Sequence, residues 1–285
     1  MMDDLYTRFR AYAMPNGGIS MSYLVDSSFT LIEARYNADN IGKIKNELEL
    51  AGCKEIDLLH ISNWDDDCCN SEELPQLLKD LQPLEVEIPA YEPTDENGMT
   101  CRKIIREFCS RSHIAELFEA GPRSLVNPIT LPDVDFTDII FSPLQYYQEC
   151  YDNSVVKIFR QGKFLVLNAS KSNRASEVLQ LLKQTKLASS VEILVVYNQE
   201  SLISNCYIGE LFLRGVNPEM IALAGGKPEL MVKSDNSLEK RGIRASRTEQ
   251  GDILVRYGIM SRKGIPNLEK NNTVCNGDYK KLADA

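Results

Sequence analysis

The order of apolar and polar residues predicts the elements of the chain, and one stretch, Ile56 to Asn70, carries most of its candidate chemistry. The stretch begins with a short apolar run, Ile56 to Ile61, of the kind that forms a buried strand. The run ends in a loop with three consecutive carboxylates, Asp65 to Asp67, followed by two thiols. Because loops at strand ends carry the functional groups of α/β proteins, we expect any site to centre on this loop.

The same patterns predict further elements in the first half of the chain. Apolar residues at helical spacing, with stop signals such as Gly52, indicate helices. Short apolar runs bounded by turn residues indicate strands. Helices are expected at residues 39–50, 71–81 and 100–117, and strands at 9–14, 20–25, 29–34, 56–61 and 84–89.

The pattern begins again near Asn153, which divides the chain into halves at about residues 1–150 and 151–260. The second half is expected to contain strands at 154–159, 163–167 and 191–197 and a helix at 172–186. Strands and helices in this order predict an α/β (α+β) fold. Residues 261–285 are polar with few apolar anchors, so we expect a solvated or loosely docked C-terminal tail.

Composition narrows the class of protein. The chain has 285 residues, 43% of them hydrophobic, which is enough for a large core. No apolar run approaches the roughly 20 residues of a membrane-spanning helix, and the first residues lack the features of a signal peptide. A net charge of −9 does not favour binding to nucleic acid or to anionic membranes, although a local basic patch stays open.

The eight cysteines are scattered without Cys-x-x-Cys spacing, so neither a zinc knuckle nor a disulfide framework is indicated. Reduced thiols in a cytoplasm are the better interpretation, and we expect a cytoplasmic protein.

The loop after Ile61 resembles the metal-binding loop of metallo-β-lactamase-fold hydrolases. In that family a strand ends in Ser or Thr and is followed by a His-x-His/Asp-x-Asp-His cluster. Here the positions after Ser62 hold Asn63, Asp65, Asp67 and Cys68. The resemblance implies a four-layer αββα sandwich of the metallo-β-lactamase type over residues 1–260.

The second half resembles the competence-protein (ComEC-type) branch of this family more specifically. That branch has Asn-x-x-Ser-Leu-Val before a hairpin, Leu-x-Thr-Gly-Asp after it, a strand ending in His-His-Gly-Ser-x-x-Ser, then Pro-x-x-x-Ile-Ser-x-Gly and Thr-x-x-x-Gly-x-Ile. The order and spacing of these motifs agree with this chain over roughly residues 8 to 257. The counterparts here are Asn153–Val156, Val166–Ser170, Asn198–Ser201 with Ser204, Pro218–Gly226 and Thr248–Ile253.

The resemblance also implies where metal ligands would lie, and most of these positions have changed. Asp65 and Asp67 keep ligand chemistry, and Cys68 keeps it as a thiolate. A neutral hydroxyl stands where the bridging carboxylate would be, and an amide oxygen binds zinc weakly. The site is therefore degenerate, no cofactor is expected, and a divalent Zn, Mn or Mg ion is the alternative. The degenerate ligand positions are Asn63, Ser170 and Asn198.

Each candidate also has a purely structural interpretation. Acidic loops are usually solvated, and most free cysteines such as Cys68 and Cys69 simply pack. Trp64 fits a packing anchor as well as a pocket mouth. His60 inside the strand fits a core histidine better than a base, and His113 lies far off on a helix.

Two hypotheses for function follow. The first is a pseudoenzyme that binds or assembles with a protein partner of unknown identity, of a kind found in bacterial operons for DNA uptake or phage defence, as the resemblance suggests. The alternative is a divergent metal-dependent phosphodiesterase or nuclease-like hydrolase that uses the loop Asp65 to Cys68, with Asp66 and Asp67 as catalytic candidates. A basic cluster is the candidate face for an acidic partner or a phosphate, and it is equally typical of a solvated surface; it consists of Lys240, Arg241, Arg244 and Arg247.

Overall fold

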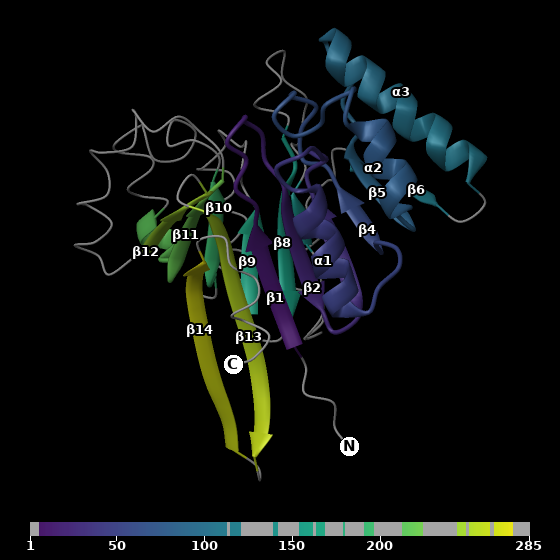
Figure 1. Cartoon of the computed structure of the whole chain (residues 1–285). Coiled ribbons are helices and arrows are strands. Elements are labelled where there is room, and N and C mark those ends of the chain that lie inside the picture. Colours follow the sequence, from purple (N-terminus) through teal and green to yellow (C-terminus); the bar gives the residue numbers. More distant parts are fainter. Residues whose placement is uncertain are drawn as a thin grey trace.

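The computed structural model describes residues 6–112, 115–120, 139–141, 154–161, 164–168, 179, 191–196, 213–224, 244–248, 251–262 and 265–275. In these ranges the chain forms two mixed β-sheets, and helices α1 to α3 lie on one side of the larger sheet (Figure 1).

The larger sheet has eight strands in the order β14-β13-β1-β2-β3-β4-β5-β6. Strands β14 to β3 pair with antiparallel neighbours, whereas β3, β4, β5 and β6 pair in parallel. The strands are β1 (Tyr6–Ala11), β2 (Met21–Val25), β3 (Ser28–Ile32), β4 (Leu58–His60), β5 (Glu85–Pro89), β6 (Glu116–Ala120), β13 (Asp252–Arg262) and β14 (Ile265–Cys275).

The smaller sheet has six strands in the order β12-β11-β10-β9-β8-β7. Strands β9 to β12 run parallel, and β8 forms antiparallel pairs with β7 and β9. The strands are β7 (Ile139–Phe141), β8 (Val156–Gln161), β9 (Phe164–Asn168), β10 (Ile193–Val196), β11 (Met220–Leu223) and β12 (Arg244–Arg247).

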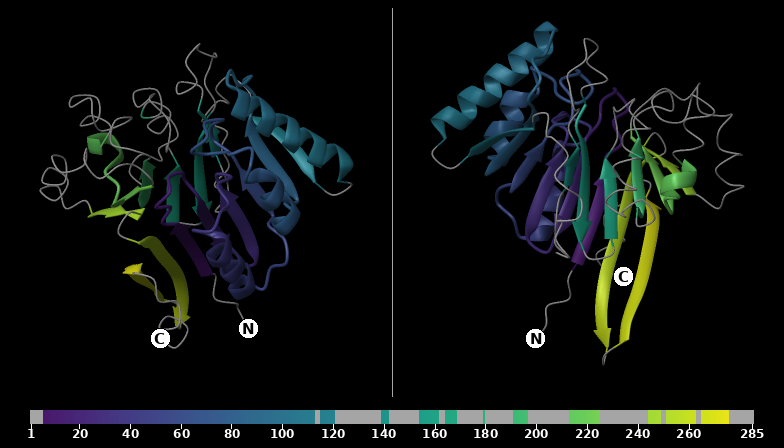
Figure 2. Two further views of the ribbon diagram at one scale, coloured as in Figure 1. Left: turned by 45° about the horizontal axis from the view of Figure 1, so that its top comes forward. Right: turned by 180° about the vertical axis from the view of Figure 1, so that it is seen from behind.

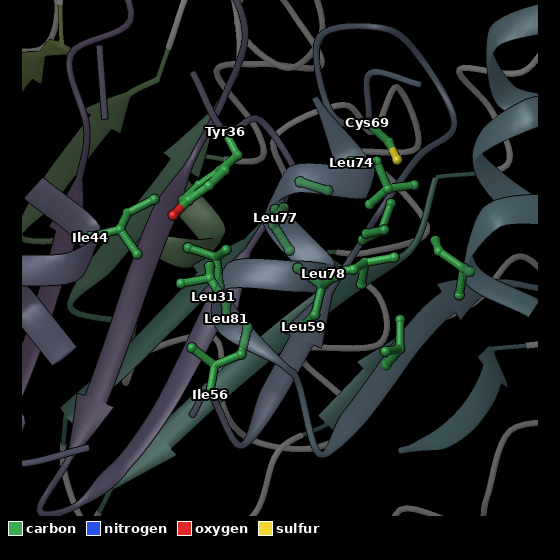
Figure 3. Packing of buried hydrophobic residues seen from close by; sticks show 14 of the residues in the cluster. Leu31, Tyr36, Ile44, Ile56, Leu59, Cys69, Leu74, Leu77, Leu78 and Leu81 are labelled. Atoms are coloured by element: carbon green, nitrogen blue, oxygen red, sulfur yellow. The ribbon is translucent and has the colours of Figure 1, made fainter. Parts of the chain in front are cut away.

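The helices α1 (Ile41–Ala51), α2 (Leu74–Leu81) and α3 (Glu96–Arg111) cover the outer face of the larger sheet. Helix α1 ends at Gly52, whose φ of 69° is the left-handed conformation that glycine adopts without strain. Asp95 caps α3 by accepting a hydrogen bond from the backbone N–H of Gly98. The apolar face of α2 packs on residues such as Leu31 and Leu59 (Figure 3).

A second core fills the space between the two sheets. Apolar residues from β1, β2 and β3 meet those from β8, β9, β10 and β11 there, and the view from behind brings the smaller sheet to the front (Figure 2). The hairpins β2–β3 and β8–β9 therefore lie in one sandwich, as expected from a pattern that begins again in the second half. Members of this core are Phe9, Met21, Tyr23, Ile32, Phe159, Val166, Ile193, Val195, Met220 and Ala222.

The helix expected at 100–117 is corrected at both ends. Helix α3 begins four residues earlier, at Glu96, and ends at Arg111, because Ser112 has extended backbone angles of φ −79° and ψ 126°. Leu117, which fits the apolar spacing of the helix, lies instead in β6 opposite Val86. A tertiary strand pairing thus overrides the local helical pattern.

The expected polar tail at 261–285 is also corrected for the residues that the structure describes. Ile265–Cys275 forms β14, which pairs along its whole length with β13. A strand of this kind is held by backbone hydrogen bonds, so a scarcity of apolar side chains does not prevent it. Residues 276–285 lie outside the described part of the chain.

The expected helix at 172–186 lies outside the described residues except for Leu179, and with it the expected fourth layer of the sandwich. The described residues form three layers, namely the helices, the larger sheet and the smaller sheet. Among the described residues, no helix combines the length and the apolar character needed to cross a membrane.

Candidate functional site

The loop that follows β4 is fixed to its surroundings through its backbone. The carbonyl of Asp67 accepts a hydrogen bond from the N–H of Ile19 at 2.7 Å, and the carbonyl of Cys68 accepts one from Ala34 at 2.6 Å. The loop turns on itself where the carbonyl of Asp65 accepts from the N–H groups of Cys68 and Cys69. It is therefore held at the carboxyl end of β3, beside the turn that precedes β2.

Asn63, a degenerate ligand position, joins the loop to the smaller sheet. Its Nδ2 donates to Oγ of Ser154 at 2.6 Å, and its Oδ1 accepts from the N–H of Asp65 at 2.8 Å. Next to it, the carbonyl of Ser62 accepts from the N–H of Val155 at 2.8 Å. The amide of Asn63 is fully buried and its oxygen is engaged within the loop, so this side chain acts as a structural link.

The three aspartates of the loop differ in exposure. The side chain of Asp66 is 62% exposed, whereas Asp65 and Asp67 are half-buried. Arg35 lies beneath them and donates from Nη1 to the carbonyl of Asp66 at 3.0 Å, while Nε and Nη2 form a two-pronged contact with Glu73. Oxygen atoms on this exposed face suit a hydrated divalent cation or a basic partner.

Glu73 serves Arg35 as a fixed counter-charge. Burial acts to raise the pKa of Glu73, but hydrogen bonds from Arg35, Asn37 and the N–H of Tyr36 hold that pKa below its ordinary value. Arg35 also lies against Gly18, where an added Cβ would approach Nη1 to 2.6 Å. Glycine is therefore required at this turn, both by its φ of 100° and by the guanidinium above it.

Both thiols of the loop are buried. Cys68 belongs to the core between the sheets, beside residues such as Phe9 and Met21. Cys69 packs on the helix side (Figure 3), where a hydrogen bond with Cys101 and burial raise the pKa of its thiol well above the usual range. Because the thiolate is the form that binds metals, Cys69 is held in its neutral form, and Cys68 has an apolar environment that does not fit a metal ligand.

A buried polar cluster lies beneath the loop. Nδ1 of His60 is 2.7 Å from Oε1 of Glu87, and Nζ of Lys157 is 2.9 Å from Oε2 of the same carboxylate. Although burial acts to raise it, His60 and Lys157 hold the pKa of Glu87 at about 2. Glu33 accepts from the N–H of Ser62 at 3.1 Å, and burial raises the pKa of this second carboxyl.

Sequence reasoning placed His60 correctly as a core residue but missed Glu33, Glu87 and Lys157 as its neighbours. Glu87 and Lys157 each interrupt an apolar run in a predicted strand, which was the available signal. Glu33 stands at the end of β3 with a φ of 64°, an uncommon conformation for a residue with a side chain. The pairing of Glu87 with Lys157 joins residues 70 positions apart and has no local signature.

The other predicted site residues are placed only in part. Trp64 is fully buried and donates from Nε1 to the carbonyl of Tyr91, which fits the packing anchor. Arg247 is half-buried, and both Arg247 and Arg244 belong to β12. Lys240, Arg241, Ser170 and Asn198 lie outside the described residues. The resemblance implies that Ser170 and Asn198 line a common cleft with Asp65 and Asp67, and this stays a prediction. In the described part of the chain, no group of three or more His, Cys, Asp or Glu side chains is arranged to hold a metal ion.

Comparison with known proteins gives similarity of fold only. No family model and no curated protein matches the sequence. The structure of Igni18, described as a novel metallo hydrolase from the hyperthermophilic archaeon Ignicoccus hospitalis, is 11% identical and has a TM-score of 0.50, with 87% of this chain and 98% of that chain covered. At this identity the match supports a shared fold.

Two further structures match with lower TM-scores. A metal-dependent hydrolase from Parabacteroides distasonis is 11% identical with a TM-score of 0.47, covering 84% of this chain and 97% of that one. Tm1679, described as a metal-dependent hydrolase of the β-lactamase superfamily, is 12% identical with a TM-score of 0.48, covering 86% of this chain and 98% of that one. The predicted α/β class is confirmed by the two mixed sheets with their helices, and the match to Igni18 shows a similar fold.

Proposed function

We propose that the chain is a pseudoenzyme on a metallo hydrolase fold, with a degenerate metal site and a role in binding a partner protein. The observation that carries the proposal is the use of the loop's own side chains in packing. Asn63 is buried against Ser154, and Cys68 is buried in the core between the sheets. Two of the positions that the resemblance assigns to metal ligands thus take part in packing, and this supports the proposal.

The remaining donors are too few for a tight site. Zinc sites in proteins take about four ligands from Cys, His and carboxylate, and the loop offers the half-buried carboxylates of Asp65 and Asp67. Carboxylates alone suit a weakly held Mg²⁺ or Ca²⁺ that keeps most of its waters. Such an ion would exchange readily and contribute little to folding.

The finer parts of the proposal rest on the resemblance to the ComEC-type branch. This resemblance suggests that the chain is a cytoplasmic assembly subunit, encoded in a bacterial operon for DNA uptake or phage defence. The basic cluster is the proposed face for an acidic partner; in it Arg244 and Arg247 lie on β12, the edge strand of the smaller sheet. Charge reversal at Arg241 and Arg244 should release the co-purifying partner at low salt, and full retention of the partner would contradict this choice of face.

The competing proposal is a divergent metal-dependent phosphodiesterase. The likeness in fold to Igni18, a metallo hydrolase, and the accessible carboxylates of Asp66 and Asp67 favour it. In that case Asp66 and Asp67 would orient a metal-bound water or the substrate.

One set of measurements separates the two functions. The purified chain is tested for bound metal by elemental analysis, for a change in melting temperature with EDTA, and for turnover of an activated phosphodiester with Mg²⁺, Mn²⁺ or Zn²⁺ supplied. The pseudoenzyme is expected to hold no stoichiometric transition metal, to melt at the same temperature with EDTA, and to show no turnover. Turnover that disappears in Asp67→Ala and persists in the control Asp39→Ala would establish the hydrolase.

Thiol labelling gives an independent readout of the same question. Cys68 is fully buried, whereas Cys53 and Cys109 are partly accessible. In the native protein Cys68 should therefore resist alkylation while Cys53 and Cys109 react. Rapid labelling of Cys68 that added Zn²⁺ prevents would show that the thiol is available as a ligand and would oppose the pseudoenzyme.

A further inference from the structure

The turn between β1 and β2 carries an exposed asparagine followed directly by glycine. The sequence contains three Asn-Gly pairs, at residues 16–17, 97–98 and 276–277, and the last lies outside the described residues. Asn16 is exposed, and Gly17 is half-buried with a φ of 93°, which glycine adopts without strain. Because glycine has no side chain, its backbone nitrogen can approach Cγ of the asparagine before it. Asparagine is a heat-labile residue, so an exposed turn of this kind suits spontaneous modification.

The contacts of the pair lie at the surface and within the turn itself. Nδ2 of Asn16 donates to Oδ2 and Oδ1 of Asp39 at 3.1 and 3.3 Å, and this contact is exposed. The N–H of Gly17 donates to the carbonyl of Met14 at 3.0 Å, which closes the turn. Local opening of a surface turn costs much less free energy than opening of a core strand. The backbone nitrogen of Gly17 therefore becomes available without unfolding of the sheet.

The second Asn-Gly pair has the opposite arrangement. Asn97 lies in the first turn of α3, where its Oδ1 accepts from the N–H of Ser71 at 2.9 Å and its Nδ2 donates to the carbonyl of Cys69 at 2.8 Å. The N–H of Gly98 donates at 2.8 Å to Oδ1 of Asp95, the cap of the helix. Both ends of the Asn97 amide are held and the attacking nitrogen is engaged, so the fold protects this pair.

We propose that Asn16 is a site of spontaneous deamidation and that its conversion weakens the attachment of the acidic loop at Ile19. The backbone nitrogen of Gly17 gives its proton to hydroxide and bonds to Cγ of Asn16, while the Cγ–Nδ2 bond breaks and Nδ2 takes up a proton and leaves as ammonia. The product is a five-membered cyclic imide. Water then opens this ring, at the main-chain carbonyl to give isoaspartate or at the former side-chain carbonyl to give aspartate. In both cases one ammonia leaves and one water enters.

The position of the turn gives the conversion a consequence for the loop. The new carboxylate replaces an amide that lies 3.1 Å from Oδ2 of Asp39, so an attractive contact becomes a repulsive one. An isoaspartyl linkage also adds one carbon to the main chain within the turn. Shortly after the turn, the N–H of Ile19 donates to the carbonyl of Asp67 at 2.7 Å. This bond depends on the path of the turn, so both changes should weaken it.

The conversion is measured on the purified full chain, incubated at elevated temperature and mildly alkaline pH, where the nitrogen of Gly17 loses its proton more often. Peptide mapping by mass spectrometry should show at Asn16 the mass gain of ammonia exchanged for water, and electron-transfer fragmentation should identify isoaspartate beside aspartate. Asn97 should stay unconverted over the same time. A synthetic peptide of residues 11–21 gives the rate without the fold. An Asn16 that stays unconverted after the peptide has reacted, or that reacts no faster than Asn97, would overturn the proposal.

Amide hydrogen exchange at Ile19 tests the effect on the loop. The aged chain should exchange this amide faster than the fresh chain. The matched variant Asn16→Gln, whose longer side chain does not form the five-membered ring, should show neither the mass gain at residue 16 nor a change in exchange with age. Unchanged exchange at Ile19 in a fully converted chain would refute the link to the loop. An equal increase with age in Asn16→Gln would also refute it, because another modification would then be the cause.

Discussion

Nζ of Lys157 lies 2.9 Å from Oε2 of Glu87, and this ion pair joins β8 of the smaller sheet to β5 of the larger one. Both side chains are almost fully buried, at 2% and 4% exposure. The ammonium also lies 5.1 Å from the centroid of the Phe159 ring. The link crosses the boundary between the two halves of the chain, so the pair should matter for how firmly the halves are held together.

Lys157→Met should destabilise the protein by about 3–5 kcal/mol, because it leaves the carboxylate of Glu87 buried without its cation. The methionine keeps most of the apolar stem, so the loss reports the charge more than the packing. Chemical denaturation at neutral pH measures the free energy of unfolding. The matched control is Lys103→Met on the exposed side of α3, which should change that free energy by less than about 0.5 kcal/mol.

The double variant Lys157→Met with Glu87→Met separates the two explanations for such a loss. If an uncompensated charge is the cause, removal of both partners should recover part of the stability. A double variant at least as unstable as the sum of the single variants would mean that the pair acts through packing alone.

Asn63→Ala should loosen the loop without breaking either sheet. The substitution removes the bond to Ser154 and the acceptor for the N–H of Asp65, each buried or partly so. Loss of hydrogen-bonding partners of this kind costs about 1–3 kcal/mol. Amide hydrogen exchange should show faster exchange within residues 62–70 and at Val155, while Asn16→Ala, an exposed site in another turn, should leave both unchanged. Equal exchange in the two variants would show that Asn63 does not hold the loop.

Local pattern predicted most of the elements because the forces that form them are local. Short apolar runs gave β2, β3, β5, β8 and β9 within a few residues, and Gly52 ended α1 where the turn chemistry requires it. The pattern failed where a distant partner decides the outcome. Leu117 continues a helical spacing yet pairs with Val86, and β14 exists because β13 offers it a backbone ladder.

The candidate site, too, could be predicted from the sequence only in part. The position of the loop could be predicted directly from the sequence, because three consecutive carboxylates after an apolar run indicate a loop at the end of a strand. Whether Cys68 packs or binds metal was left open, and in the structure its side chain lies in the core between the sheets. The buried contact of Glu87 with Lys157 could not be derived from the sequence, since it depends on how the two sheets face each other.

A last prediction concerns Asp252, which ties β13 to β1 and α1. Its Oδ2 accepts from Nε of Arg10 at 3.0 Å, and its Oδ1 accepts from the N–H of Ala13 at 2.7 Å and from Nζ of Lys43 at 2.9 Å. Burial acts to raise the pKa of Asp252, but Arg10, the N–H of Ala13 and Lys43 hold that pKa below its ordinary value. Asp252→Asn should lower the free energy of unfolding by about 3–5 kcal/mol at neutral pH.

The sign of the pH dependence follows from the lowered pKa in the folded state. The aspartate contributes its full stabilisation above its unfolded pKa of about 3.9, and this contribution is lost as pH falls through the lower folded value. The difference between the original chain and Asp252→Asn should therefore be constant from about pH 7 to 5 and narrow below about pH 4. Chemical denaturation at several pH values measures it, with the exposed Glu72→Gln as the control that shows little difference. A difference that widens on acidification would mean that Asp252 is stabilised in its protonated form, against the ion pairs described above.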